Sequence, residues 1–253
     1  MKSNRLLLQF ILALLLPASL LQAQSTETVY RKTIPLGKMR EIKTSLSFFA
    51  GKLQMDTSTD KLAECYYGYS DSYIEPYVHY DEIGALTIKN KKDRDIPKRA
   101  KDGNKWRLSL NPSVQNNLMI EMLAGESDIN LSGAKLSRVE YSMLAGEVKL
   151  NLSNTSVPKM VFKMTAGEAW IDLTGDWKND CDAQLSGGVG EINLKVPQKT
   201  GVKVYVTGLL GEAKLPGFNK DGKTYTNDAW GKSKHELSIY ISGGIGEINV
   251  SME

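Results

Sequence analysis

The sequence Val139-Glu-Tyr-Ser-Met-Leu-Ala-Gly-Glu-Val-Lys-Leu150 carries the pattern that decides the fold. Apolar and polar residues alternate on both sides of its Gly-Glu pair, as in a strand with one buried face. The pair recurs along the chain at spacings of 21, 21, 23, 21 and 35 residues. Its copies are Gly125-Glu126, Gly146-Glu147, Gly167-Glu168, Gly190-Glu191, Gly211-Glu212 and Gly246-Glu247. A nearly constant period of this size indicates a repeat architecture.

Other positions keep register with the glycine of each pair. The residues seven and five positions before the glycine, and four after it, are apolar in every repeat, as Tyr141 and Leu150 are around Gly146. We also expect buried residues one position before and two positions after the glycine, for example Ala145 and Val148. The two residues between them then form a corner, where glycine tolerates a sharp turn. Each repeat is therefore predicted to hold two strands of about seven residues with one buried face.

This pattern predicts an all-β, repetitive β-solenoid with repeats of about 21 residues over residues 116–253. Strands of neighbouring repeats would lie about 4.8 Å apart and enclose an aliphatic core. A less regular β region over residues 24–115 is expected to continue this architecture, with strand-like runs at 46–55, 62–69, 77–80, 85–89 and 105–110. An antiparallel barrel or sandwich is disfavoured, because antiparallel strands need not repeat their side-chain chemistry at every second strand. The charged segment 91–103 lacks periodicity and is predicted to be a solvated loop.

Residues 1–23 have the pattern of a cleavable secretory signal. Lys2 and Arg5 precede an apolar run at 6–16, and the segment ends on Ala23. A membrane anchor is the alternative, but the apolar run is shorter than the ~20 residues that a bilayer requires. No later stretch is apolar enough to span a membrane. A lipoprotein is disfavoured, because there is no cysteine near Ala23. We therefore expect an exported protein, in the periplasm, at the cell surface or secreted, after cleavage near Ala23.

Composition excludes several classes of function. Apolar residues make up 41% of the 253 residues, too many for a disordered chain. With 32 basic and 29 acidic residues, the charge is too balanced to indicate a nucleic-acid partner. Cys65 and Cys181 lie in alternating runs and are predicted to be buried and unpaired, while His79 and His235 are isolated in the sequence. We expect no catalytic residue and no cofactor.

A family resemblance follows from the order of these motifs. Ala50-Gly-Lys-Leu53, tyrosine-rich strands, Trp106-Arg-Leu-Ser-Leu-Asn-Pro112, the Ala-Gly-Glu repeats and the insertion Tyr225-Thr-Asn-Asp-Ala-Trp230 follow one another. This order resembles the bacterial toast-rack domains of unknown function, which are similar to the C-terminal part of LiaF-like cell-wall-antibiotic-response proteins. The resemblance implies a right-handed, solenoid-like all-β fold outside the membrane, without established enzymatic activity. LiaF-like proteins carry membrane helices before this domain and regulate an envelope-stress sensor kinase, whereas this chain shows only the predicted signal.

The repeated glutamates are the candidate site. If the repeats stack in register, the carboxylates form one column: Glu126, Glu147, Glu168, Glu191, Glu212 and Glu247. Like charges about 4.8 Å apart repel by roughly 1 kcal/mol per pair in water. Backbone N–H groups and the lysines Lys149, Lys163 and Lys214 are expected to offset this repulsion. Bound Ca²⁺ is the alternative, disfavoured because the motif lacks the Asp/Asn-rich spacing of repeat calcium loops.

Outward-facing apolar residues suggest a second kind of site. Leu123, Leu144 and Leu209 precede the glycine by two positions, and Tyr205, Tyr240 and Trp170 also fall on outward positions. Aligned along the stack they would form a stripe for a glycan or protein partner. Packing beneath the N-terminal segment is the simpler interpretation, and core packing is the default for the tyrosines between residues 66 and 80.

Three classes of function follow. The first is a non-catalytic exported envelope protein, a scaffold for binding or adhesion to an envelope protein or glycan, with a link to the envelope stress response as one option. The second is a carbohydrate-active β-helix enzyme, which would need paired acids at unrepeated positions. The third is a self-assembling structural protein, because the last strand, at 248–252, would leave an open edge for a homo-oligomer unless the insertion 216–236 caps it.

Overall fold

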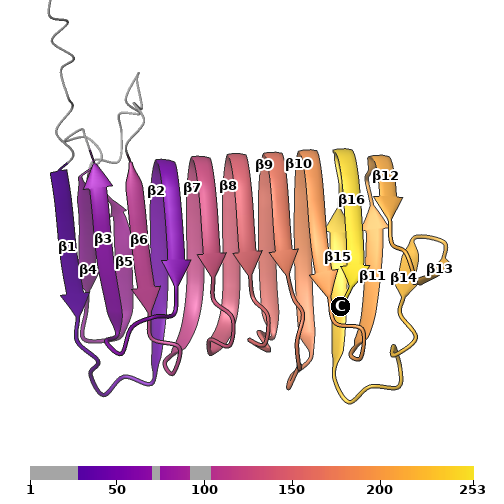
Figure 1. The fold of residues 1–253 in the computed structure, drawn as a ribbon, viewed down its shortest axis with the longest axis horizontal. Coiled ribbons are helices and arrows are strands. Elements are labelled where there is room, and N and C mark those ends of the chain that lie inside the picture. Colours follow the sequence, from indigo (N-terminus) through magenta and orange to yellow (C-terminus); the bar gives the residue numbers. More distant parts are fainter. Residues whose placement is uncertain (1–27, 70–74, 92–103) are drawn as a thin grey trace, which may run out of the picture.

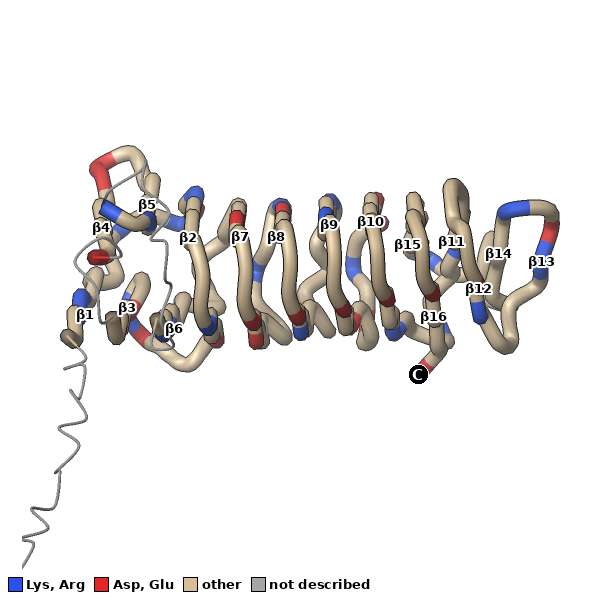
Figure 2. Tube along the Cα trace, turned by 90° about the horizontal axis from the view of Figure 1, so that it is seen from above, with Lys and Arg blue, Asp and Glu red and all other residues tan. Residues whose placement is uncertain are grey.

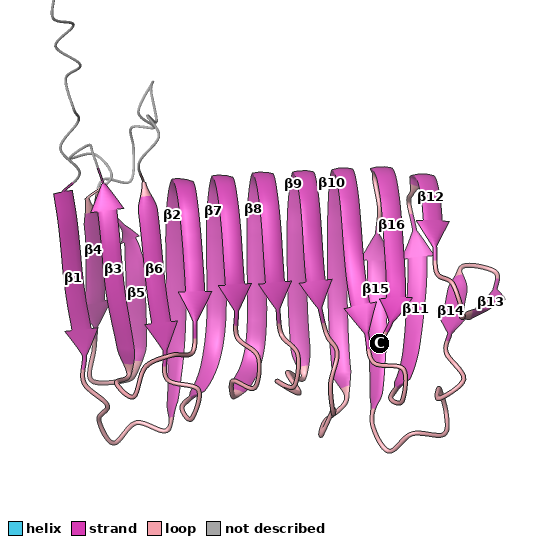
Figure 3. Ribbon diagram, viewed as in Figure 1, coloured by secondary structure: helices cyan, strands magenta, loops and turns pink. Residues whose placement is uncertain are grey.

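The computed structural model describes residues 28–69, 75–91 and 104–253. The predicted export signal and most of the charged segment 91–103 lie outside these residues. The described chain is all-β, as predicted: its strands form one large mixed sheet, and it contains no helix (Figure 3). No helix that could cross a membrane is therefore found in this part of the chain.

Five long strands form the centre of the molecule and lie side by side (Figure 1). Each is parallel to the next, and each glycine of the repeat pairs with the glycine of its neighbour, from Gly51 to Gly190. The predicted in-register stacking of the Gly-Glu pairs is confirmed. The strands are β2 (Glu41–Asp56), β7 (Gln115–Asn130), β8 (Leu136–Asn151), β9 (Lys159–Asp172) and β10 (Cys181–Val196).

Each long strand folds over at one end of the stack (Figure 2). The bend lies at the repeat glycine, which has a positive φ, and the halves before and after it pair with different strands at both ends of the sheet. The predicted buried positions on both halves are buried, as Ile120 and Ile129 of β7 show. Contacts between the halves cross the core: Tyr141 lies before the bend of β8, and its hydroxyl is 2.6 Å from the Ser127 hydroxyl, after the bend of β7. The Tyr141 ring also stacks on Phe162 of β9 at a centroid distance of 5.4 Å.

The bend requires glycine for two reasons. Gly146 has φ +144°, a conformation that residues with a side chain rarely adopt. A Cβ atom at Gly146 would also lie closer than 3.0 Å to the carbonyl oxygen of Gly125, a separation that real Cβ atoms essentially never show. Since Gly125 is the equivalent bend of the previous strand, the bends touch through their backbones.

The corner is wider than the sequence pattern suggested. The prediction of a buried residue one position before the glycine is wrong, because Ala145 is exposed and Val189 is 55% exposed. Met143, three positions before Gly146, is buried instead, and burial resumes at Val148. The chain turns over the end of the sheet through four residues, and side chains on the outside of such a turn cannot reach the core.

Shorter strands close the N-terminal end. β5 (Ala85–Asn90) and β6 (Lys105–Leu110) pair in parallel with the first and second half of β2. Outside them, β4 (Pro76–Tyr80) and β3 (Ala63–Tyr69) run antiparallel, and β1 (Thr28–Ile34) pairs with β3. Trp106 fills this end of the core, with its ring centroid 4.5 Å from Phe48 and 4.6 Å from Tyr67. The strands predicted at 62–69, 77–80, 85–89 and 105–110 are present, and Tyr67 packs in the core as expected.

The C-terminal end departs from chain order. β15 (Glu236–Ser242) and β16 (Ile245–Met252) pair with β10 and lie between it and the earlier strands β11 (Gly201–Thr207) and β12 (Leu210–Lys214). The expectation that residues 248–252 form an open edge is therefore wrong for Ile248 and Asn249, which pair with β12. The long connection between β12 and β15 permits this order, because the chain has to return past β11 and β12 before β15 and β16 can pair with β10.

The insertion at 216–236 does cap part of the edge. It forms a hairpin of β13 (Asn219–Asp221) and β14 (Thr224–Thr226), and β14 pairs antiparallel with β11. β12 has only β16 as a partner, so that its other side is the open edge at this end of the described chain.

We expect Gly146→Ala to lower the free energy of unfolding by about 3 kcal/mol or more, because it adds backbone strain and a clash with Gly125. Guanidinium chloride unfolding followed by circular dichroism measures this change. Gly37→Ala is the matched control, since Gly37 has open space around it and no left-handed φ. Equal midpoints for the two variants would contradict the proposed role of the glycine contact.

Candidate functional site

The outer face formed by the second halves of the strands carries three side-chain columns. Residues one, three and five positions after each glycine point outward, and parallel in-register pairing places equal positions side by side. The first column holds the glutamates. The second column holds Asp128, Lys149, Trp170, Asn193, Asn249 and Lys214, and the third holds Asn130, Asn151, Asp172, Lys195, Ser251 and Pro216.

The second and third columns line a groove of about 670 Å³. It crosses the strands from β7 to β12, and Trp170 on β9 lies near its middle. Trp170 is half-buried and is the one aromatic residue among the described residues that line the groove. Lys149 and Asn193 flank it on the neighbouring strands, and the Lys149 Nζ atom lies 5.7 Å from the centroid of the indole ring.

Each lysine of the groove has a carboxylate partner. Lys149 lies 3.2 Å from Glu147 and Lys195 lies 2.6 Å from Glu253. Lys214 lies 2.9 Å from Glu247 and 3.3 Å from Glu212, and hydrogen bonds to these two carboxylates raise the pKa of Lys214. The positive charges of the groove are therefore compensated by the protein itself.

The amide side chains of the groove are held in place by hydrogen bonds. Asn130 and Asn151 each accept a bond at Oδ1 from the backbone N–H two residues further on, at 3.2 and 2.9 Å. Asn249 donates from Nδ2 to Glu191 at 2.7 Å and to Asn193 Oδ1 at 3.2 Å. These amides present donors and acceptors with a fixed orientation.

The predicted glutamate column exists, because all six glutamates lie side by side in the register of the strands. On β2, Lys52 takes the equivalent position and lies 3.4 Å from Glu126. Lys149 and Lys214 pair with the column as expected, whereas Lys163 lies before the bend of β9. Among the described residues, no group of three or more His, Cys, Asp or Glu side chains is placed to hold a metal ion. Cation binding by the column stays the disfavoured alternative, and nothing in the described residues tests it.

Comparison with known proteins identifies the family. The family model described as "N-terminal domain of toast_rack, DUF2154" matches residues 22–159 and 140–195. The chain belongs to this toast-rack family. No curated protein matches the sequence.

One solved structure has the same fold, and others are less similar. A "putative cell adhesion protein" from Clostridium sporogenes is 25% identical with a TM-score of 0.68, and the match covers 90% of this toast-rack chain and 100% of the other. A "putative adhesin" from Bacteroides fragilis is 12% identical with a TM-score of 0.34, over 88% of this chain and 98% of the other. The resemblance to the clostridial protein extends over nearly the whole described sheet.

The outward apolar residues do not form a single stripe on this toast-rack chain. Leu123 and Leu144 lie at the corner, and Leu209 packs against the core. The rings of Tyr205 and Tyr240 pack against each other in a tilted arrangement, with centroids 4.6 Å apart. They lie on the first halves of their repeats, on the opposite side of the core from Trp170. The outward position of Trp170 was predicted from the sequence, but the groove around it was not. The polar residues at the positions three and five after most of the glycines are the sequence signal for it.

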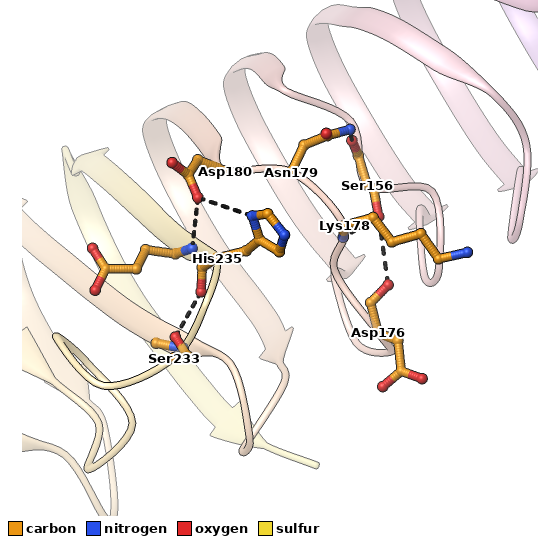
Figure 4. Close-up of polar contacts among 9 residues, drawn as sticks. Ser156, Asp176, Lys178, Asn179, Asp180, Ser233 and His235 are labelled. Atoms are coloured by element: carbon orange, nitrogen blue, oxygen red, sulfur yellow. Dashed lines mark hydrogen bonds and ion pairs between the residues drawn. The ribbon is translucent and has the colours of Figure 1, made fainter.

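A serine, a histidine and an aspartate meet in one loop region of the toast-rack chain (Figure 4). The His235 Nδ1 atom lies 3.5 Å from Asp180, a contact that the sequence did not indicate. However, the Ser233 hydroxyl donates to the backbone carbonyl of His235 at 2.6 Å and accepts from the backbone N–H of Gly201 at 2.7 Å. The hydroxyl thus holds the connection between strands and is not activated by the imidazole, as a nucleophile would be.

Both cysteines of the toast-rack chain are buried and free, as predicted. Burial raises the pKa of Cys65 to about 11 and that of Cys181 to about 12. Since the thiolate is the reactive form, neither thiol is poised for chemistry near neutral pH.

We expect no thiol of the native toast-rack protein to react with Ellman's reagent at pH 8, and both cysteines to react after unfolding in guanidinium chloride. The absorbance of the released thionitrobenzoate measures the number of reacting thiols. Rapid modification of the folded protein would contradict the burial of Cys65 and Cys181.

We expect Glu168→Gln to stabilise the protein by up to about 1 kcal/mol at low ionic strength, and by close to zero at 1 M salt. Glu168 lies between Glu147 and Glu191 and makes no ion pair within the described chain, so that the substitution removes only repulsion. Thermal unfolding at both salt concentrations measures the effect.

Glu212→Gln is the control for this substitution, because Glu212 lies in the last strand of the column and pairs with Lys214. It should bring no gain in stability at low salt. The same measurement tests cation binding. If CaCl₂ raises the Tm of the unsubstituted protein, and this rise disappears in Glu168→Gln, the column binds cations.

Proposed function

We propose that this toast-rack chain is an exported, non-catalytic, adhesin-like protein of the cell envelope. In this proposal, residues 24–115 and 116–253 form one right-handed β-solenoid that follows a cleaved signal at 1–23. The groove around Trp170 is the observation that carries the proposal: about 670 Å³ of space on a rigid sheet, lined by oriented polar side chains. The similar clostridial protein, which is described as a putative cell adhesion protein, supports an adhesive function.

The construction of the sheet suits adhesion. The strands under the groove are hydrogen-bonded on both sides, except at the outer side of β12 and at the end of β16 after Asn249, so that their backbone is fixed before a partner arrives. Preorganisation of this kind lowers the entropic cost of binding. Repeat architectures also present extended faces, which suit contact with large envelope components.

Catalysis is the less favoured alternative. A glycosidase needs two carboxyl groups in a cleft, one of them able to act as an acid. Asp128 in the groove is exposed, and Asp172 accepts hydrogen bonds from the Thr174 N–H and hydroxyl at 2.8 and 2.6 Å, which gives it a role in the turn.

Self-assembly through the C-terminal end is also less favoured. The open strand β12 has five residues, contains Lys214 and is followed closely by Pro216. Short length, lysine and proline are the features by which natural sheets protect their edges against pairing.

Adhesion of protein-coated beads to immobilised envelope material tests the proposal. We expect the unsubstituted protein to hold the beads under flow, and Asn193→Arg to reduce adhesion several-fold, because its long side chain fills the groove. Gln184→Arg is the matched control: it changes another outward amide of β10, on the opposite side of the core. Equal adhesion of both variants would exclude the groove as the adhesive site. Degradation of polysaccharide in the immobilised material would instead favour the alternative of a carbohydrate-active enzyme.

A further inference from the structure

We infer that the groove binds an uncharged carbohydrate chain, with a sugar ring stacked on Trp170. This inference rests on the proposed function and adds the chemical class of the partner. Three observations carry it: the single aromatic side chain, the compensated charge and the ordered amides.

The position of Trp170 suits stacking. It lies on β9, with strands of the same sheet on both sides. Apart from Pro216, the other outward side chains of the groove are polar. An indole offers a flat apolar surface next to an N–H donor. A pyranose ring has the complementary form, since its C–H groups make one flat face and its hydroxyl groups point outward around the ring.

The charges of the groove disfavour an anionic partner. Lys149, Lys195 and Lys214 are each held by carboxylates of the protein. An anionic ligand would have to compete with these ion pairs, and the glutamate column along the same face would repel it. Nucleic acid and sulfated polysaccharides are therefore disfavoured, whereas hydroxyl groups bring no charge to this surface.

The amides supply partners for hydroxyl groups. The Oδ1 atoms of Asn130 and Asn151 accept hydrogen bonds from backbone N–H groups of the turns that follow them. Their Nδ2 groups are therefore the donors that face a ligand. Asp128 and Asp172 in the same groove are acceptors. A hydroxyl group both donates and accepts, so that it satisfies either kind of partner.

The geometry fits a chain of sugars better than a peptide. Extended peptides are commonly bound by adding a strand to an open sheet edge, but the groove lies on the face of strands that are already paired. Six strands at about 4.8 Å spacing give the groove a length of about 24 Å, which is enough for more than one sugar ring.

Isothermal titration calorimetry with neutral hexasaccharides of glucose, mannose and N-acetylglucosamine tests the inference, with a heparin hexasaccharide as the anionic comparison. We expect binding of at least one neutral probe, no tighter binding of heparin, and a loss of about tenfold or more in affinity in Trp170→Ala. Tyr240→Ala is the matched control, since Tyr240 is an exposed aromatic residue on the opposite side of the core; it should bind like the unsubstituted protein.

The outcomes separate the inference from the proposed function. No heat with any neutral probe, or equal affinity in Trp170→Ala, overturns the carbohydrate inference. If bead adhesion persists in that case and Asn193→Arg still reduces it several-fold, the groove binds a different partner and the adhesive function stands. If adhesion is also unaffected by Asn193→Arg, both the carbohydrate inference and the proposed adhesive role of the groove are wrong.

Discussion

The contact between the backbones of successive glycines constrains everything else in this molecule. At each bend, the carbonyl oxygen of one repeat lies where a side chain of the next would begin, from Gly51 under Gly125 to Gly190 under Gly246. A shift of one residue would bring a side chain against that oxygen and would also turn every core residue outward. The glycine column therefore fixes the register, and the register fixes which side chains are neighbours over the whole sheet.

The uniform register has a cost and a use. It aligns six carboxylates, whose repulsion is relieved by lysines from neighbouring positions and by Asn249. Because the backbone is regular, a side chain that differs from its neighbours in the column changes the surface only at that one place. Trp170 is such a departure, because the equivalent positions on the adjacent strands are Lys149 and Asn193. On a repetitive sheet, binding specificity can arise from single non-repeated residues.

The two ends solve the problem of open sheet edges in different ways. At the N-terminal end, antiparallel strands and an aromatic cluster around Trp106 terminate the core. At the C-terminal end, a hairpin covers β11, and β12 is left short and charged. Both solutions interrupt the parallel repeat, which explains why the sheet as a whole is mixed.

The sequence by itself determined the strands, their buried positions away from the bend and the alignment of the Gly-Glu pairs. These features depend on alternation within a strand and on a constant period, and both can be read along the chain. Only the tertiary structure decided that Ala145 faces outward, that β15 and β16 lie between β10 and β11, and that a groove surrounds Trp170. These features depend on how the chain turns over the end of the sheet and on which distant segments become neighbours. The pairs Lys195–Glu253 and Asp180–His235 bring together residues more than 50 positions apart, and no local pattern encodes such contacts.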